Sequence, residues 1–152
     1  MCDRKACITA SSMFKQTFNC AESVLAGIAD ELGIISDNIP KIASGFGAGI
    51  SRQGVICGAL SGAIMGLGLK YGRSTPDNVA KSVLYEMVGE LWTKFEREFG
   101  SVNCVDLTDC DMMTEKGMND FKSRDLHNTL CPKFVIWAAE NAMSFIEPHS
   151  AD

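Results

Sequence analysis

Seven cysteines are the residues of this chain with the most evident chemistry, and they stand at positions 2, 7, 20, 57, 104, 110 and 131. Thiolates bind soft metals and iron–sulfur clusters, and pairs of thiols form disulfides reversibly. The number is odd, the spacings are irregular and no C-x-x-C pair occurs, which argues against the disulfide framework of a small secreted protein. Intracellular cysteines are more often metal ligands, redox groups or core residues than structural bridges.

Two of these cysteines stand at predicted helix starts. Cys20 follows the N-cap candidate Asn19, and Cys131 directly precedes Pro132. Unpaired backbone N–H groups and the positive end of the helix dipole favour a thiolate there. Cys104 follows the predicted end of a long helix, and Cys57 falls in the first turn of another. In a simple up-and-down bundle these positions do not share one end, so their convergence requires connections that cross over.

The elements that must position these thiols are predicted to be helices. Apolar residues recur at helical spacing, and no stretch alternates polar and apolar residues as a strand would. The sequence therefore predicts one all-α domain over residues 1–152, a helical bundle of four to five helices. The four main helices begin near Asn19, Gly54, Pro76 and Pro132, and the first dozen residues supply the fifth. Residues 101–130 read as a long connection with one short helical turn around 118–122.

The longest predicted helix follows Ser74, Thr75 and Pro76, which suggest a Ser/Thr cap with proline in the first turn. Its apolar residues form two rows at helical spacing and predict a broad buried face. These rows are Val79, Val83, Met87, Leu91, Phe95 and Phe99, and Leu84, Val88 and Trp92. Glu90 and Lys94 form a favourable i,i+4 pair beside them. This helix is expected to belong to the core.

Gly58, Gly62 and Gly66 form a ridge on the most apolar helix, immediately after Cys57. Each glycine inside a helix costs roughly 0.5 to 1 kcal/mol relative to alanine. Such a ridge therefore predicts close approach of a neighbour, with a second helix as the first candidate. Gly58 would also leave room for a second thiol or a metal cluster.

Composition and motifs exclude several classes of protein. The net charge of -5 and the pI near 5.0 argue against nucleic acid and anionic membrane surfaces as partners. The uncharged window 53–69 is short and rich in glycine, so no membrane insertion is expected. The N-terminus lacks the apolar run of a signal peptide, and a cytoplasmic location is expected.

Other site motifs are absent or weak. The glycines of "GFGAG" do not fit a dinucleotide-binding fingerprint, and Asp106, Asp109 and Asp111 do not fit a calcium loop. No nucleophile and base stand out as a pair, which leaves open whether the protein is an enzyme. His127 is expected to be solvated in a polar connection, and no role is expected for His149 in the terminal tail.

Five segments together resemble a known family. They are "FNCAESVL" at 18–25, "FGAGI" at 46–50, "VICGALSGAIMGLGL" at 55–69, "FGSVNC" at 99–104, and Cys131 followed by "FVIWAAE". This order resembles the C_GCAxxG_C_C family of redox-active proteins. The resemblance places the four cysteines of the family name on Cys20, Cys57, Cys104 and Cys131. It places the CGAxxG motif on Cys57, Gly58, Ala59 and Gly62, and leaves Cys2, Cys7 and Cys110 outside.

The family is also similar to the bundle domain of split-Soret cytochromes, in which an iron–sulfur cluster lies at one end of the helices. The resemblance therefore implies a cluster, with the 2Fe-2S form favoured. The chain has no C-x-x-C-H motif, so covalent c-type haem is not implied.

Three hypotheses of function follow from these residues. The first is a redox protein that uses the four cysteines as iron–sulfur ligands or as redox-active thiols, in electron transfer with a protein partner. As thiols, the four could form two disulfides in three connectivities. The second is a non-catalytic accessory protein that binds a soft metal such as zinc or copper, although structural zinc usually has closer ligand spacing. The third is a structural helical homodimer without a redox role.

Overall fold

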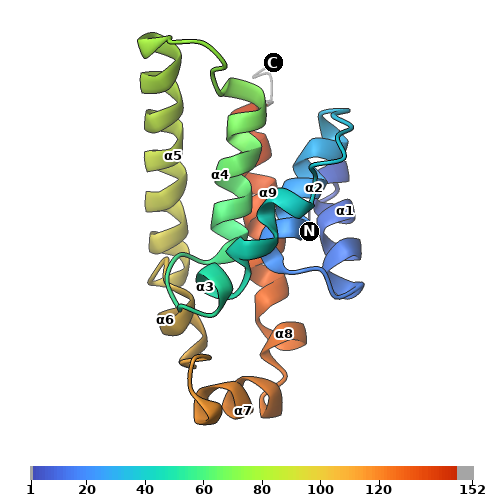
Figure 1. Cartoon of the computed structure of the whole chain (residues 1–152), viewed down its shortest axis with the longest axis vertical. Coiled ribbons are helices and arrows are strands. Elements are labelled where there is room, and N and C mark those ends of the chain that lie inside the picture. The colour runs from blue at the N-terminus through green and yellow to red at the C-terminus, as the bar shows by residue number, and fades with distance from the viewer. Residues whose placement is uncertain (1, 147–152) are drawn as a thin grey trace.

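The computed structural model describes residues 2–146, and its regular structure is helical, as the sequence predicts (Figure 1). The elements are α1 (Lys5–Lys15), α2 (Cys20–Glu31), the 3-10 helix η1 (Lys41–Phe46), α3 (Gly47–Ser51), α4 (Gly58–Tyr71), α5 (Asn78–Phe99), α6 (Cys104–Thr108), α7 (Glu115–Ser123), α8 (Leu126–Thr129) and α9 (Cys131–Ile146). Within the described residues the single β-type contact is an isolated antiparallel bridge between Ile56 and Asn103. None of the helices in this range combines the length and apolar character needed to cross a membrane.

The core is formed where α1, α2, α4 and α9 pack together. Each contributes small and branched apolar side chains with little or no exposed area. Examples are Ala6 and Ala10 from α1, Val24 and Ile28 from α2, Leu60 and Leu67 from α4, and Val135 and Met143 from α9. Burial of such side chains contributes about 1.5–3 kcal/mol each for the larger ones. These four helices form the rigid body that carries the remaining elements.

The glycine ridge of α4 packs against α2 of the same chain. A Cβ atom at Gly62 would lie 2.6 Å from the carbonyl oxygen of Ala21, and one at Gly66 would lie 2.9 Å from Cγ2 of Ile28. A Cβ atom at Gly58 would collide with the sulfur of Cys20. Both expected uses of the ridge are therefore present, because it admits a neighbouring helix and makes room for a thiol.

Two helix starts illustrate how the sequence determines local structure. At α2, the Asn19 side chain accepts from the Glu22 N–H at 2.9 Å, and Glu22 accepts from the Asn19 N–H at 2.8 Å. This reciprocal capping box confirms the predicted N-cap. At α5, in contrast, the prediction of a Ser/Thr cap with Pro76 in the first turn is wrong. Asp77 caps the helix by accepting from the Ala80 N–H at 2.9 Å, and α5 begins at Asn78.

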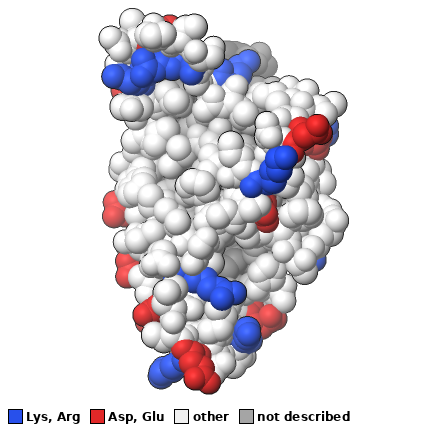
Figure 2. All heavy atoms as spheres, viewed as in Figure 1, with Lys and Arg blue, Asp and Glu red and all other residues white. Residues whose placement is uncertain are grey.

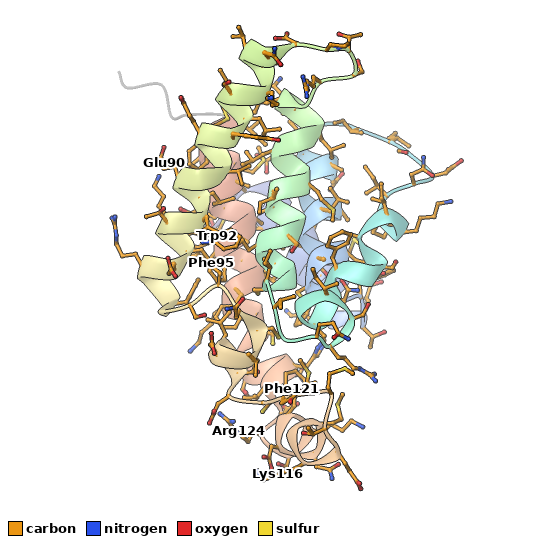
Figure 3. All side chains as sticks on the ribbon, turned by 60° about the vertical axis from the view of Figure 1, so that its left-hand side comes forward. Glu90, Trp92, Phe95, Lys116, Phe121 and Arg124 are labelled. Atoms are coloured by element: carbon orange, nitrogen blue, oxygen red, sulfur yellow. A yellow bond between two sulfur atoms is a disulfide. The ribbon has the colours of Figure 1, made fainter. Side chains whose placement is uncertain are left out.

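The prediction that α5 belongs to the core holds chiefly for its second half. Of the expected buried rows, only Leu91 and Phe95 are fully buried, while Val79 is 75% exposed and Val83 42% exposed. Edge contacts between aromatic rings attach the second half of α5 to α9. They join Phe95 to Trp137 with a centroid separation of 5.3 Å and Phe99 to Phe134 at 4.9 Å. Figure 3 shows Phe95 and Trp92 on the inner side of α5 and Glu90 on its outer side.

Residues 101–130 are more ordered than the sequence predicts. They contain α6, α7 and α8, where the sequence predicts a single helical turn. The Thr114 side chain caps α7 by accepting from the Gly117 N–H at 2.9 Å, and Gly117 packs closely against the backbone of Asp111. These short helices have few apolar residues from which periodicity could be recognised. Together they cross the lower end of the molecule in Figure 1.

Two long connections set the topology that matters for the cysteines. Residues 32–57 return the chain from the end of α2 to the end where α2 began, so that α4 starts there too. The antiparallel α5 then delivers residue 104 to that same end, and residues 109–130 keep the chain there until α9 begins (Figure 1). Several helix starts therefore meet at one end of the bundle.

Candidate functional site

Four cysteines distant in sequence line one cavity of about 370 Å³ at this end of the bundle. Cys20, Cys104 and Cys131 are the first residues of α2, α6 and α9, and Cys57 is the N-cap of α4. All four are free thiols, buried or half-buried. The structure thus brings together the four positions that the resemblance indicates. Two boundaries differ from the predicted ones, because α4 begins after Cys57 and Cys104 opens a helix of its own.

Backbone pairing fixes Cys57 and Cys104 beside each other. The Cys57 N–H donates to the Val102 carbonyl at 2.7 Å, and the Cys104 N–H donates to the Val55 carbonyl at 2.8 Å. These bonds flank the bridge between Ile56 and Asn103. The extended backbone before α4 is therefore required by the site, which is why α4 begins four residues later than predicted.

The segment α3 supports the site with an unusual backbone conformation. Its φ angles are positive from Ala48 to Arg52, with values of 54°, 64°, 63°, 49° and 74°. For residues other than glycine a left-handed conformation costs roughly 1–2 kcal/mol each. Backbone outliers of this kind persist only where the surroundings hold them, and they cluster at functional sites. Ala48 and Arg52 of this turn line the cavity.

Three glycines allow the backbone to approach the thiols. A Cβ atom at Gly49 would lie 2.6 Å from Cβ of Cys104, and one at Gly47 would lie 2.6 Å from Cβ of Asn19. Gly58, as described above, leaves space for the sulfur of Cys20. Side chains at these positions would push the surrounding backbone away from the cysteines.

Burial raises the pKa of each of the four thiols. The pKa of Cys104 and that of Cys131 rise to about 12, chiefly by desolvation and further by the neighbouring Cys20. The pKa of Cys57 rises well above its ordinary value for the same two reasons. Neutral thiols are therefore the resting form at pH 7 when no cation is bound.

Backbone donors act in the opposite direction. Desolvation raises the pKa of Cys20, whereas the backbone N–H groups of Ala48, Ala21 and Ala59 act to lower it. The N–H group of Ala59, a residue of the CGAxxG motif, also acts to lower the pKa of Cys57. These donors and the helix starts are arranged for sulfur that carries negative charge.

The cavity has a cationic and apolar lining that the sequence did not predict. Arg52 and Lys122 line it, and the side chain of neither makes a hydrogen bond or ion pair with a described residue. No Asp or Glu of residues 2–146 lines it. Met112, Met118 and Phe121 contribute apolar surface from the connection between α6 and α8. These residues carry no local motif, so only the fold identifies them.

His127 differs from its predicted solvated state. It is half-buried, lines the same cavity and stacks on Phe14 with ring centroids 4.2 Å apart. The stacking connects α8 to α1 across the site. His149 lies outside the described residues.

The three remaining cysteines do not line the cavity, although Cys110 packs in the same apolar cluster as Cys104. Cys2 and Cys7 form a disulfide with Cα atoms 6.1 Å apart, which the sequence did not predict. Cys110 is a buried free thiol that does not line the cavity, and Arg124 Nη1 lies 3.7 Å from its sulfur. Figure 3 shows Arg124 at the lower end of the molecule, near Phe121 and Lys116.

Comparison with known proteins identifies the family of the chain. Residues 18–145 match the model of the family described as "Putative redox-active protein (C_GCAxxG_C_C)". The chain belongs to the C_GCAxxG_C_C family. A protein of Archaeoglobus fulgidus is 33% identical to this chain over 103 residues, which cover 62% of this chain and 68% of that protein. That protein is named only as uncharacterized, and no solved structure matches the chain.

Proposed function

We propose that Cys20, Cys57, Cys104 and Cys131 bind an iron–sulfur cluster and that the protein transfers electrons through it. The observation that carries the proposal is the meeting of four cysteines at four helix starts around one cavity. Four thiolates are the common ligand set of such clusters, and reversible one-electron transfer is the chemistry that a bound cluster supplies. Membership of a family described as redox-active supports the same conclusion.

The raised pKa values of the thiols favour metal binding over thiol–disulfide exchange. Exchange requires a thiolate, and its rate at neutral pH falls when the pKa of the thiol is far above 7. Cys104 and Cys131, with pKa values raised to about 12, would be poor nucleophiles. A metal cation removes this obstacle because a coordinated thiol loses its proton.

The surroundings fit a negatively charged cluster. Backbone N–H groups of Ala48 and Ala59 act to lower the pKa of Cys20, and N–H donors to sulfur tune the potential of a cluster. The unpaired cations Arg52 and Lys122 would offset the negative charge of four coordinated thiolates. Because Gly58 has no side chain, the sulfur of Cys20 can lie close to the start of α4.

The arrangement is less suitable for a single soft metal ion. Among residues 2–146, no group of three or more His, Cys, Asp or Glu side chains is gathered so that it could hold a metal ion. The four thiols instead surround a cavity, which suits a core of several atoms. The accessory-protein hypothesis therefore receives less support than the cluster hypothesis.

The decisive experiment is purification without oxygen, followed by iron and acid-labile sulfide determination and a visible spectrum. We expect iron and sulfide in equal amounts and absorption that bleaches on addition of dithionite. Two irons per chain would indicate the 2Fe-2S form that the family resemblance favours. A colourless protein with zinc or copper would favour the accessory role, and a metal-free protein with disulfides would favour thiol chemistry.

Matched cysteine variants connect the cluster to the cavity. Cys20→Ser, Cys57→Ser, Cys104→Ser and Cys131→Ser should each lose most of the bound iron, whereas Cys110→Ser should retain it, because Cys110 does not line the cavity. Circular dichroism of each variant verifies that the helices are formed. Retention of iron in all of the first four variants would refute the proposal.

A further inference from the structure

One flank of α5 is an apolar surface that no element within residues 2–146 covers. A groove of about 370 Å³ between α4 and α5 is lined by Ile64, Leu84, Tyr85, Val88, Gly89 and Trp92, none of them charged. Tyr85 is 67% exposed although it lies in this groove. In the view of Figure 2, most of the surface over α4 and α5 is free of charged side chains. We call this surface the α5 groove.

No close neighbour in the described part of the chain explains the glycine at position 89 in the α5 groove. It lies inside a helix of 22 residues, and a Cβ atom built on it meets nothing within 4 Å. Glycine in such a position costs up to about 1 kcal/mol relative to alanine. The three glycines of the α4 ridge differ, because each of them faces a close neighbour, whereas Gly68 near the end of α4 has surroundings as open as those of Gly89. Gly89 therefore leaves room on the α5 groove for the close approach of a partner.

Two unpaired charges of opposite sign border the same flank. Lys81 precedes Tyr85 by four residues, and Glu96 follows Trp92 by four, so both lie on the groove side of α5 at helical spacing. Neither has an ion-pair partner among residues 2–146. Along this flank the order is therefore a cation (Lys81), an aromatic ring (Tyr85), the central pair Val88 and Gly89, a second aromatic ring (Trp92) and an anion (Glu96).

This order is complementary to itself when reversed. In an antiparallel pair of α5 helices centred between Val88 and Gly89, Lys81 lies opposite Glu96 of the second copy. Tyr85 then lies opposite Trp92 of the second copy, and Val88 faces the glycine that permits close approach. A parallel pair would instead place like charges together, which is unfavourable.

We propose that the protein forms a homodimer with two-fold symmetry through antiparallel α5 helices. Two-fold symmetry makes each contact occur twice, as in most homodimers. Burial of Tyr85 and Trp92, which are typical residues of interface centres, supplies the apolar contribution. The exposed Tyr85 and Gly89 and the incomplete burial of the first half of α5 are then properties of the separated subunit.

The dimer proposal is independent of the proposed metal site, which lies at the other end of the bundle from the start of α5 (Figure 1).

A charge exchange tests both the dimer and its register. Sedimentation equilibrium should show a dimer for the unmodified protein. Lys81→Glu and Glu96→Lys should each weaken the dimer at least about tenfold, because symmetry converts two attractive pairs into two repulsive ones. The double variant, with both charges exchanged, should restore the original dissociation constant. Arg97→Glu provides the control, since it makes the same change of charge on α5 outside this flank.

Gly89→Leu tests the close approach. A larger side chain should leave the subunit folded, because no atom lies within 4 Å of the added Cβ, yet it should separate the dimer. A monomer at all concentrations for the unmodified protein would overturn the proposal. A dimer that resists both Gly89→Leu and the single charge changes, or a double variant that fails to recover, would overturn the proposed surface and register.

Discussion

At the scale of single residues, the absence of a side chain at Gly58 determines how near Cys20 comes to α4. The sequence pattern identified this glycine and its partners on the ridge, because their spacing is regular. Family resemblance, and not spacing, identified Cys20, Cys57, Cys104 and Cys131 as one group. The cations Arg52 and Lys122 could not be predicted as part of the site. Each lies in a segment between the main helices, and the sequence of these segments has no regular pattern that shows where they fold.

Gly58→Ala should therefore damage the site more than the helix. The added methyl group collides with the Cys20 sulfur, and overpacking of this kind typically costs about 1–3 kcal/mol. We expect a lower free energy of unfolding in urea and a reduced iron content after anaerobic purification.

Gly68→Ala is the matched control for that variant. Gly68 lies on the same helix, and a Cβ atom there meets nothing within 4 Å. The variant should gain up to about 1 kcal/mol in stability from helix propensity and keep its iron. Equal iron contents in the two variants would show that the space at Gly58 is not required by the cysteines.

At the scale of elements, the helices predicted best are those with a strong period and a clear cap. The Asn19 and Glu22 capping box of α2 is an example, since local hydrogen bonds alone define where that helix begins. The sequence predicts the start of α4 four residues too early, because pairing of residues 55–57 with 102–104 overrides the helical preference. The apolar rows of α5 indicate a helix correctly, but periodicity does not distinguish a face buried in the same chain from one that a partner covers.

The α5 cap gives a test at this scale. Asp77→Ala removes the acceptor for the Ala80 N–H and should lower the stability by about 1 kcal/mol, with a lower melting temperature in calorimetry. Thr75→Ala, at a position that the sequence had suggested as the cap, should leave the melting temperature nearly unchanged. A larger loss at Thr75 than at Asp77 would contradict the observed start of α5.

At the scale of the whole molecule, the four raised thiol pKa values link folding to pH. A thiol whose pKa is higher in the folded chain than in the unfolded chain favours folding while it remains protonated. This contribution is complete below pH 9 and is lost as the pH rises toward 12, the value for Cys104 and Cys131. Each thiol that titrates in this range lowers the stability by up to about 1.4 kcal/mol per pH unit.

The metal-free, reduced protein should accordingly become easier to unfold in urea between pH 9 and pH 11. Replacing Cys104 and Cys131 by serine should reduce this slope, because hydroxyl groups do not ionise in the range. Urea midpoints measured at several pH values compare the two proteins, and other titrating groups cancel in the comparison. Identical slopes would show that these thiols are not buried in the folded protein.

The origin of the site's residues also affects how the protein is made. Cys131 follows Cys20 by 111 positions in the sequence, so the cavity that the four thiols line cannot form until the ribosome has released this whole segment. A cluster held by all four thiols, as proposed above, would therefore be acquired only after this part of the chain has been synthesised.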